Sequence, residues 1–476
     1  MSTLKDYWPF PSFRAGQEEV LEEIEESWDQ YDVFVVRAPT AWGKSPLAVA
    51  LQNWVMGEHH ASAAITVPNN VLREQYLDEF AHLKTIRALK DYWIEEYGMS
   101  ELEFRKKIYQ YGPRNSQYNL DRSTVKRVGS PICVNYHSYI AHKLQRNTVI
   151  VDEAHLLLGT LQEFAARKIW RHKTHYPFGL RSLADVQQWA EQAPPSPAIQ
   201  RLRDEMESLT PATLIQLAKE PYRGVMKECI KLLPLSVEND APIFWPSKTN
   251  KVVLISATLG EDDLRLMGHG TKRIKWISPT SPIPVDRRAI KLDFIGNMSY
   301  HNQDRLIEDL LDKISSLRER YLGSKGFVHA SYSLANKIRH AVRGDPSFDW
   351  MVFHGRDNKQ DVYDDFAASS IDTSQVMIGS GMAEGIDMHE DIARWQCIAK
   401  IPYPSLADPA MRYIAQNNSD YYNWMVSREI MQSAGRVCRS PDDYGITHIL
   451  DNSWVRWYEN VADRLPEWFT EAVETT

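Results

Sequence analysis

Short runs of apolar, mostly β-branched residues alternate with segments of helical pattern along most of this chain. In the first half, four such runs predict buried strands, at 33–36, 63–67, 148–151 and 252–255. Further strand candidates follow at 291–295, 326–329, 351–353, 376–378, 397–399 and 446–450. Strands that alternate with helices form βαβ units, in which helices cover a parallel sheet. The sequence therefore predicts an α/β fold with two parallel-sheet domains.

Two stretches interrupt this alternation, and both are expected to be insertions because strand candidates resume after each. Residues 85–130 are helical in pattern, charged and aromatic, and residues 158–245 are expected to be mostly helical. A proline-rich stretch around Pro282 marks a linker. The remaining segments are a first α/β domain made of residues 1–84, 131–157 and 246–284, and a second α/β domain at 285–476.

Composition narrows the class of protein. The 476 residues carry a net charge of −8, so any contact with nucleic acid is expected to use local basic patches. The four cysteines are too far apart in the sequence for a zinc clip or a disulfide framework. No apolar run approaches the about 18 residues of a membrane span. We therefore expect a cytoplasmic protein without a membrane partner, and separately we expect it to be a monomer.

A phosphate-binding loop is predicted at residues 38–45, between the first strand and the following helix. Backbone N–H groups at such a turn, aided by the helix dipole, bind phosphate oxygens. Lys44 can reach the β- and γ-phosphates of a nucleotide, and the hydroxyl of Ser45 can bind Mg²⁺. Ala41 and Trp42 stand where small residues are typical, so we expect Trp42 to point outward, away from the nucleotide.

A pair of acidic residues, Asp152 and Glu153, directly follows the strand at 148–151. Asp152 can hold Mg²⁺ through water, and Glu153 can orient and deprotonate an attacking water. Alternatively, the two acids only favour the N-terminus of a helix. That alternative does not explain why they accompany an upstream Gly-Lys-Ser.

These residues belong to a series of motifs that resembles the superfamily 2 helicases, and within them the XPD/DinG type. In chain order, residues 13–17 resemble the element upstream of motif I, 38–45 motif I, 67–70 motif Ia, 152–155 a DEAH-type motif II, 256–258 motif III, 381–387 motif V and 432–439 motif VI. The Glu-Gly-Ile-Asp run at 384–387, with the prolines at 402, 404 and 409, points to the XPD/DinG type. The resemblance implies two RecA-like domains.

The resemblance also assigns roles to residues. The nucleotide is expected to contact Arg14, Gln17, Thr40, Gly43, Lys44, Ser45, Glu384, Gly385 and Asp387. Catalysis is assigned to Asp152, Glu153, Gln432, Arg436 and Arg439, Mg²⁺ binding to Ser45 and Asp152, and coupling to nucleic acid to Asn69, Ser256 and Thr258. Read without the family, Gln17 is an ordinary surface residue, and the two hydroxyls cap the end of a strand.

Motif VI can be interpreted from its chemistry. Phosphoryl transfer spreads negative charge over the γ-phosphate oxygens, which a guanidinium group stabilises. Arg436 and Arg439 are three residues apart and would share one face of a helix. If they reach across from the second domain, hydrolysis requires domain closure, and this cycle is a motor stroke. The alternative is two exposed surface arginines.

One family feature is missing from the sequence. XPD and DinG enzymes typically hold an iron–sulfur cluster on four cysteines between motifs Ia and II, where this chain has only Cys133. We therefore expect no cluster. The insertion at 85–130 is rich in basic and aromatic residues, which suit DNA contact, although its aromatic residues could equally form a small core. The insertion at 158–245 corresponds in position to the family's arch domain.

The sequence leaves three functions open. The first is an ATP- and Mg²⁺-dependent motor that moves 5′ to 3′ on single-stranded or forked DNA and separates strands. The second is an RNA helicase, because grooves that track a backbone do not reveal which sugar they bind. The third is an ATP-gated binding or remodelling protein that does not unwind.

Overall fold

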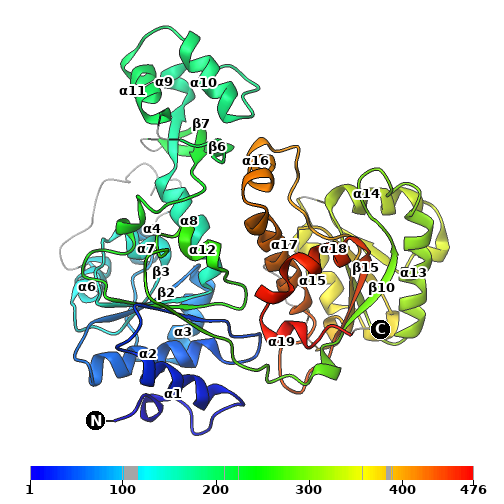
Figure 1. Ribbon diagram of the computed structural model, residues 1–476, viewed down its shortest axis with the longest axis horizontal. Coiled ribbons are helices and arrows are strands. Elements are labelled where there is room, and N and C mark those ends of the chain that lie inside the picture. The colour runs from blue at the N-terminus through cyan, green and yellow to red at the C-terminus, as the bar shows by residue number, and fades with distance from the viewer. Residues whose placement is uncertain are drawn as a thin grey trace.

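The computed structural model describes residues 2–98, 100, 116–207, 209–222, 225–355, 357–381, 388 and 390–474. Two domains lie side by side, and a third unit rises from the first of them (Figure 1). The first domain holds a six-stranded parallel sheet in the order β3-β2-β4-β8-β1-β9. Its strands are β1 (Val33–Val36), β2 (Ala63–Val67), β3 (Ile132–Asn135), β4 (Thr148–Asp152), β8 (Lys251–Ile255) and β9 (Ile274–Ile277). Its helices are α1 (Gln17–Ser27), α2 (Lys44–Gly57), α3 (Asn70–Glu79), α7 (Tyr136–Ala141) and α12 (Glu261–Leu266).

The strands of this sheet are apolar at nearly every position because a hydrophobic core covers each of its two faces. Along β1, Val33 and Val35 join one hydrophobic core, whereas Phe34 and Val36 join the core on the opposite face. Alternate residues of a strand point to opposite faces, so a strand buried on both sides must be apolar at every position.

The second domain repeats this design with a parallel sheet in the order β10-β15-β14-β11-β13-β12. Its strands are β10 (Ile290–Gly296), β11 (Gly326–His329), β12 (Met351–Phe353), β13 (Val376–Gly379), β14 (Trp395–Ile398) and β15 (Ile446–Asp451). Its helices are α13 (Ile307–Arg320), α14 (Tyr332–Ala341), α15 (Lys359–Ala368), α16 (Pro409–Asn417), α17 (Ser419–Ala434), α18 (Ser453–Val461) and α19 (Glu467–Thr470). The predicted α/β class with two parallel-sheet domains is confirmed.

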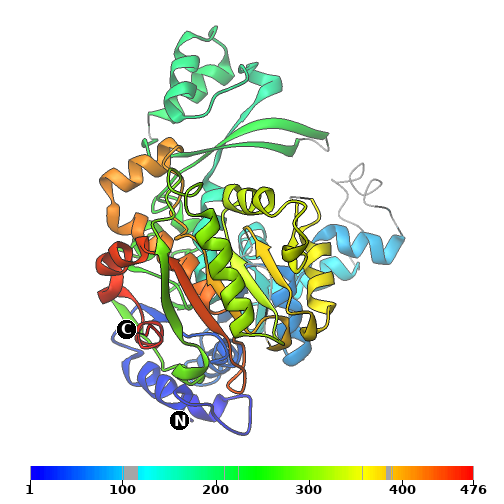
Figure 2. The ribbon, with the colours of Figure 1, turned by 90° about the vertical axis from the view of Figure 1, so that its right-hand side faces the viewer.

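The unit that rises from the first domain differs from its expected, mostly helical form. It contains a three-stranded antiparallel sheet, β5-β7-β6, whose long hairpin stands out in Figure 2. Its elements are α8 (Leu157–Ala165), β5 (Arg167–Trp170), α9 (Arg171–Thr174), α10 (Leu183–Gln192), α11 (Pro197–Met206), β6 (Leu214–Tyr222) and β7 (Val225–Leu233). Leu, Gln, Ala, Lys and Glu in β6 favour a helix locally, but pairing with β7 decides the outcome because strand preference depends on neighbours.

The described part of the insertion at 85–130 contains α4 (Leu89–Tyr97) and α6 (Gln117–Lys126). Tyr92 and Tyr118 are buried in the core of the first domain, with ring centroids 5.5 Å apart. These two aromatic residues therefore serve as core, whereas residues 101–115 lie outside the described residues. The segment boundaries stay predictions. Within the described chain, no helix combines the length and apolar character needed to cross a bilayer.

Candidate active site

The phosphate loop joins the end of β1 to the start of α2 at Lys44. Ala41 and Gly43 adopt left-handed backbone conformations, with φ of 65° and 96°. A Cβ atom on Gly43 would lie 2.5 Å from Nε2 of Gln17, and together with its positive φ this favours glycine at this position. The turn places Lys44 and Ser45 in the first turn of α2, where free backbone N–H groups and the helix dipole favour phosphate.

Trp42 does not point outward as expected. Its side chain is 0% exposed and lies in the hydrophobic core between the sheet and α2. The left-handed residues on either side of Trp42 reverse the chain locally, which turns the indole toward the core. The expected outward direction of Trp42 is therefore wrong.

Arg14 and Gln17, upstream in the sequence, hold the backbone of this loop through hydrogen bonds. Gln17 is 2% exposed, so it is not a surface residue. Its Nε2 donates to the carbonyl of Trp42 at 2.5 Å, and its Oε1 accepts from the backbone N–H of Arg14 at 2.6 Å. Nη1 of Arg14 donates to the carbonyl of Ala41 at 2.7 Å. Both side chains therefore hold the backbone of the loop, and their expected contacts to the nucleotide stay predictions.

The acidic pair lies at the end of β4, with only β8 between β4 and β1 in the sheet. Carboxyl ends of parallel strands share one edge of a sheet, which brings this pair to the phosphate loop. Nζ of Lys44 donates to Oε1 of Glu153 at 2.5 Å. Glu153 has a left-handed backbone, with φ of 50°, and its side chain remains 28% exposed. Its carboxylate therefore faces the loop and is accessible from the cleft.

Asp152 is buried and held by two tyrosines that sequence reasoning missed. The hydroxyl of Tyr76 donates to Oδ2 of Asp152 at 2.8 Å and also interacts with the hydroxyl of Ser45. The hydroxyl of Tyr136 donates to the carbonyl of Asp152 at 2.5 Å. A buried tyrosine in a core carries no sequence signal for such a role. The Tyr76 hydroxyl thus brings the side-chain oxygens of Ser45 and Asp152 close together. Mg²⁺ prefers oxygen ligands of this kind, so these two residues fit the ion.

The charges of this pair are set by their surroundings. Burial, and then the neighbouring charge of Glu153, raise the pKa of Asp152. Burial also acts to raise the pKa of Glu153, but the Lys44 ammonium and His155 outweigh it and lower that pKa. A carboxylate whose pKa is lowered stays ionised at neutral pH, so Glu153 can accept a proton or a hydrogen bond from water.

Motif III contacts the DEAH motif directly. Nδ1 of His155 and Oγ of Ser256 are 2.9 Å apart, and Ser256 Oγ also accepts from the backbone N–H of Thr258 at 3.2 Å. Ser256 therefore both caps its own strand end and contacts motif II. Burial lowers the pKa of His155 to about 4, so the ring is neutral at pH 7. Asn69 of motif Ia caps α3, because its Oδ1 accepts from the N–H of Leu72 at 2.9 Å.

Motif VI reaches the same site from the second domain. A Cβ atom on Gly435 would lie 3.0 Å from Oγ1 of Thr40, so the two loops meet across the interface. The charge of Arg439 contributes to lowering the pKa of Glu153, and the charge of Arg436 to lowering that of His155. Both arginines are partly buried, so they are not merely surface residues.

The expectation that Arg436 and Arg439 share a helix face is wrong. α17 ends at Ala434, and Gly435 follows as its C-terminal cap, so both arginines lie in the loop beyond the helix. Gln432 is still helical and lines a cavity of about 510 Å³ together with His155. The three motif V residues Glu384, Gly385 and Asp387 lie outside the described residues.

The cysteines are spread over the molecule. Cys133 lies on β3, Cys229 on β7, Cys397 on β14 and Cys438 in motif VI, and all four are buried free thiols. Among the described residues, no group of three or more His, Cys, Asp or Glu side chains is arranged to hold a metal ion. The expected lack of an iron–sulfur cluster stays a prediction.

Comparisons with known proteins match both halves of this site. The family described as "Helicase C-terminal domain" matches residues 318–472, and the family "Type III restriction enzyme, res subunit" matches residues 11–180. ATP-dependent DNA helicase YoaA of Escherichia coli is 23% identical over 240 residues, which cover 48% of this chain and 37% of YoaA. ATP-dependent DNA helicase CHL1 of Candida albicans is 25% identical over 118 residues, 21% of this chain and 14% of CHL1. The matches thus span much less than two thirds of these relatives.

Solved structures share the fold over nearly the whole chain. Xpd4 of S. tokodaii has a TM-score of 0.58 and 14% identity, and the match covers 96% of this chain and 99% of that one. A further XPD helicase gives a TM-score of 0.60 with 14% identity, covering 95% and 98% of the two chains. Together with the ordered motifs, the two matching families and the shared fold support an XPD/DinG-like superfamily 2 helicase.

Proposed function

We propose that the protein is an ATP-dependent motor that moves 5′ to 3′ on single-stranded DNA and separates the strands of duplexes. The observation that carries this proposal is the meeting of three elements at one cleft. Lys44 and Glu153 of the first domain form an ion pair. The charge of Arg439, in the second domain, contributes to lowering the pKa of Glu153, and Gly435 of the second domain lies against Thr40 of the first. A nucleotide held there would touch both domains.

Each residue has a role in hydrolysis. Lys44 and the N–H groups at the start of α2 bind phosphate oxygens, and Thr40 and Gly43 shape the loop around them. Glu153 orients and deprotonates the attacking water. Ser45 and Asp152 would hold Mg²⁺, which neutralises phosphate charge when bound. Arg436, Arg439 and Gln432 stabilise the charge on the transferred group.

Hydrolysis on an interface can drive movement. Because the arginines come from the second domain, the γ-phosphate favours the closed arrangement of the domains and its loss weakens that preference. Ser256 and Thr258 follow β8, and Asn69 follows β2, each within three residues of the strand end, so all three lie near the same edge of the first sheet. Their hydroxyl and amide groups are candidates for coupling this cycle to a nucleic-acid backbone.

The relatives support DNA as the substrate, since YoaA and CHL1 are both named as DNA helicases. The 5′ to 3′ direction rests on the resemblance to the XPD/DinG type. Single-stranded or forked DNA is therefore the proposed partner, and RNA is the alternative that the test must include.

The test is unwinding of a labelled duplex that carries a single-stranded tail on either the 5′ or the 3′ side, in DNA and RNA versions, with ATP and Mg²⁺. The expected result is strand separation of the 5′-tailed DNA alone. Lys44→Ala, which removes the phosphate-binding ammonium, is the control and should abolish both unwinding and ATP turnover. ATP turnover without unwinding of any duplex would replace the proposal by a translocase or remodelling protein. Preference for RNA would overturn the DNA assignment.

A further inference from the structure

The two domains are joined by a buried polar contact outside the family motifs. It connects α12, which follows motif III in the first domain, to α17, which leads to motif VI in the second. Oδ2 of Asp263 accepts from Nε1 of Trp424 at 3.1 Å, and its Oδ1 accepts from Nη1 of Arg428 at 3.3 Å. Asp263 is 1% exposed and Trp424 is 2% exposed. The carboxylate on one domain therefore holds two donors from the other.

The backbone around Asp263 is shaped for the indole of Trp424. A Cβ atom on Gly260 would lie 2.3 Å from Nε1 of Trp424, so only glycine allows the ring to approach. The N–H of Gly260 donates to Oδ2 of Asp263 at 3.0 Å, which fixes the carboxylate beneath the ring. Gly260 and Asp263 together form a socket for Trp424, and we call them the α12 socket.

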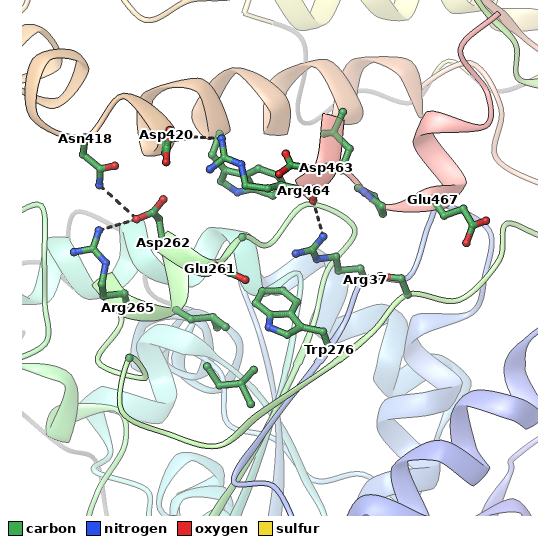
Figure 3. A pocket seen from close by; sticks show the side chains of 18 residues that line it. Arg37, Glu261, Asp262, Arg265, Trp276, Asn418, Asp420, Asp463, Arg464 and Glu467 are labelled. Atoms are coloured by element: carbon green, nitrogen blue, oxygen red, sulfur yellow. Dashed lines mark hydrogen bonds and ion pairs between the residues drawn. The ribbon is translucent and has the colours of Figure 1, made fainter. Parts of the chain in front are cut away.

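The strand that leads to the phosphate loop lies beside this socket. Arg37, the residue after β1, places its guanidinium 4.3 Å from the ring centroid of Trp276 and 5.7 Å from that of Trp424. Its Nη1 donates to the carbonyl of Arg464 in the second domain at 2.8 Å. These residues line an interdomain cavity of about 680 Å³, with Arg37 and Trp276 on one wall and α17 along the other (Figure 3).

The α12 socket lies between two motifs of the active site. On α17, Trp424, Arg428 and Gln432 follow each other at intervals of four residues and so share a helix face. The charge of Arg428 also contributes to lowering the pKa of His155, so this guanidinium lies near the DEAH motif. On the other side, α12 begins three residues after Thr258. A shift of α17 against α12 would therefore move motif VI relative to motifs II and III.

We propose that Asp263 is a positioning residue for ATP hydrolysis, which holds the α17 helix so that the motif VI loop reaches the nucleotide. The inference rests on the proposed function. Asp263 does not touch the nucleotide site itself and acts through Trp424 and Arg428. The simpler reading is that Asp263 only caps α12 through its bond to Gly260. That reading gives Trp424 and Arg428 no part in turnover, so substitutions can separate the two.

The variants are Asp263→Asn, which keeps the size of the side chain but removes its charge, and Trp424→Phe, which removes the indole N–H. Glu261→Gln is the control for Asp263→Asn, since it removes one negative charge from an exposed side chain in the first turn of the same helix. Trp395→Phe is the control for Trp424→Phe. Trp395 is equally buried in the second domain, and its indole N–H has no partner within the described chain.

The measurement is steady-state ATP turnover with saturating single-stranded DNA, together with KM for ATP. We expect kcat to fall about tenfold or more in Asp263→Asn and Trp424→Phe, since a hydrogen bond to a buried charge is lost. KM should stay within about twofold because Lys44 and its loop are untouched. The double variant should be no slower than the slower single variant, because both substitutions disrupt the same contact between α12 and α17. Both controls should keep wild-type kcat.

Three results would overturn the proposal: wild-type kcat in both test variants, an equal fall in kcat in the controls, or full additivity in the double variant. If Asp263→Asn does not fold, Trp424→Phe decides by the same criteria. A wild-type protein that binds ATP but never hydrolyses it would overturn the proposed function itself. Normal wild-type turnover with normal test variants would overturn only the role of Asp263.

Discussion

Nζ of Lys44 and Oε1 of Glu153 lie 2.5 Å apart, although the two residues are 109 positions apart in the chain. The parallel sheet causes this contact, because β1 and β4 end at the same edge with one strand between them. One residue of the pair can bind phosphate and the other can accept a proton, so the two sides of a hydrolysis site are already assembled within the first domain.

Replacing Glu153 by glutamine should separate binding from hydrolysis. The amide keeps the size of the side chain and a hydrogen-bonding oxygen, but it cannot accept a proton from water at neutral pH. We expect ATP and single-stranded DNA to bind with near wild-type affinity while kcat falls by about a hundredfold or more. Nucleotide titration and single-turnover hydrolysis would measure the two effects. Wild-type hydrolysis in this variant would rule out the role given to Glu153.

Arg439→Ala tests the contribution of the second domain. The charge of Arg439 contributes to lowering the pKa of Glu153, but Arg439 lies outside the phosphate loop. Because a guanidinium at this position acts on charge that develops in the transition state, kcat should fall by about a thousandfold with little change in ATP affinity. A large loss of ATP affinity with unchanged kcat would show instead that Arg439 holds the ground state.

Tyr76→Phe should alter the Mg²⁺ requirement. The Tyr76 hydroxyl contacts both Asp152 and Ser45, so its removal frees both of the side chains proposed to hold the ion. We expect the Mg²⁺ concentration for half-maximal ATP turnover to rise about tenfold, as is typical when a group that orients ligands is lost. Turnover at saturating Mg²⁺ should recover most of the wild-type value. An unchanged Mg²⁺ dependence would show that this hydroxyl does not orient the ligands.

His269→Phe should reduce the loss of stability in acid. His269 is buried against Trp245, and neither ring nitrogen has a hydrogen-bond partner among the described residues. Burial, with a smaller contribution from Lys272, lowers its pKa to about 4, from 6.5 in an exposed histidine. Between these values the unfolded chain binds the proton and the folded chain does not, so stability is full above pH 6.5 and falls as the pH drops toward 4.

This histidine alone can account for a loss of about 3 kcal/mol by pH 4. The variant should therefore show a shallower decline in the free energy of unfolding between pH 6.5 and 4 than the wild type. Urea unfolding at a series of pH values would measure it. His155 and His329 are partly buried, and their pKa values are also lowered to about 4, so they keep part of the decline in the variant. Equal slopes for the two proteins would contradict the prediction.

Local sequence determined the framework of this protein. The run Val33–Val36 had to be a doubly buried strand because every position is apolar, and Gly43-Lys44-Ser45 had to follow it as a phosphate loop because its geometry depends on adjacent residues. Asp152 and Glu153 follow the predicted strand at 148–151, and they could be placed at the same edge because the carboxyl ends of parallel strands share one edge of a sheet. These features depend on short stretches of chain, so the sequence predicts them well.

Tertiary structure decided the features that the local sequence pattern left open or misjudged. Only packing shows that Trp42 turns into the core, that β6 pairs with β7 instead of forming a helix, and that Gly435 releases the motif VI arginines from α17. Tyr76 gains its contact with Asp152, and Asp263 its contacts with Trp424 and Arg428, only because the sheet order and the domain interface bring them together. Local propensity acts over a few residues, whereas these contacts join residues 76 to 165 positions apart, and no pattern along the chain records them.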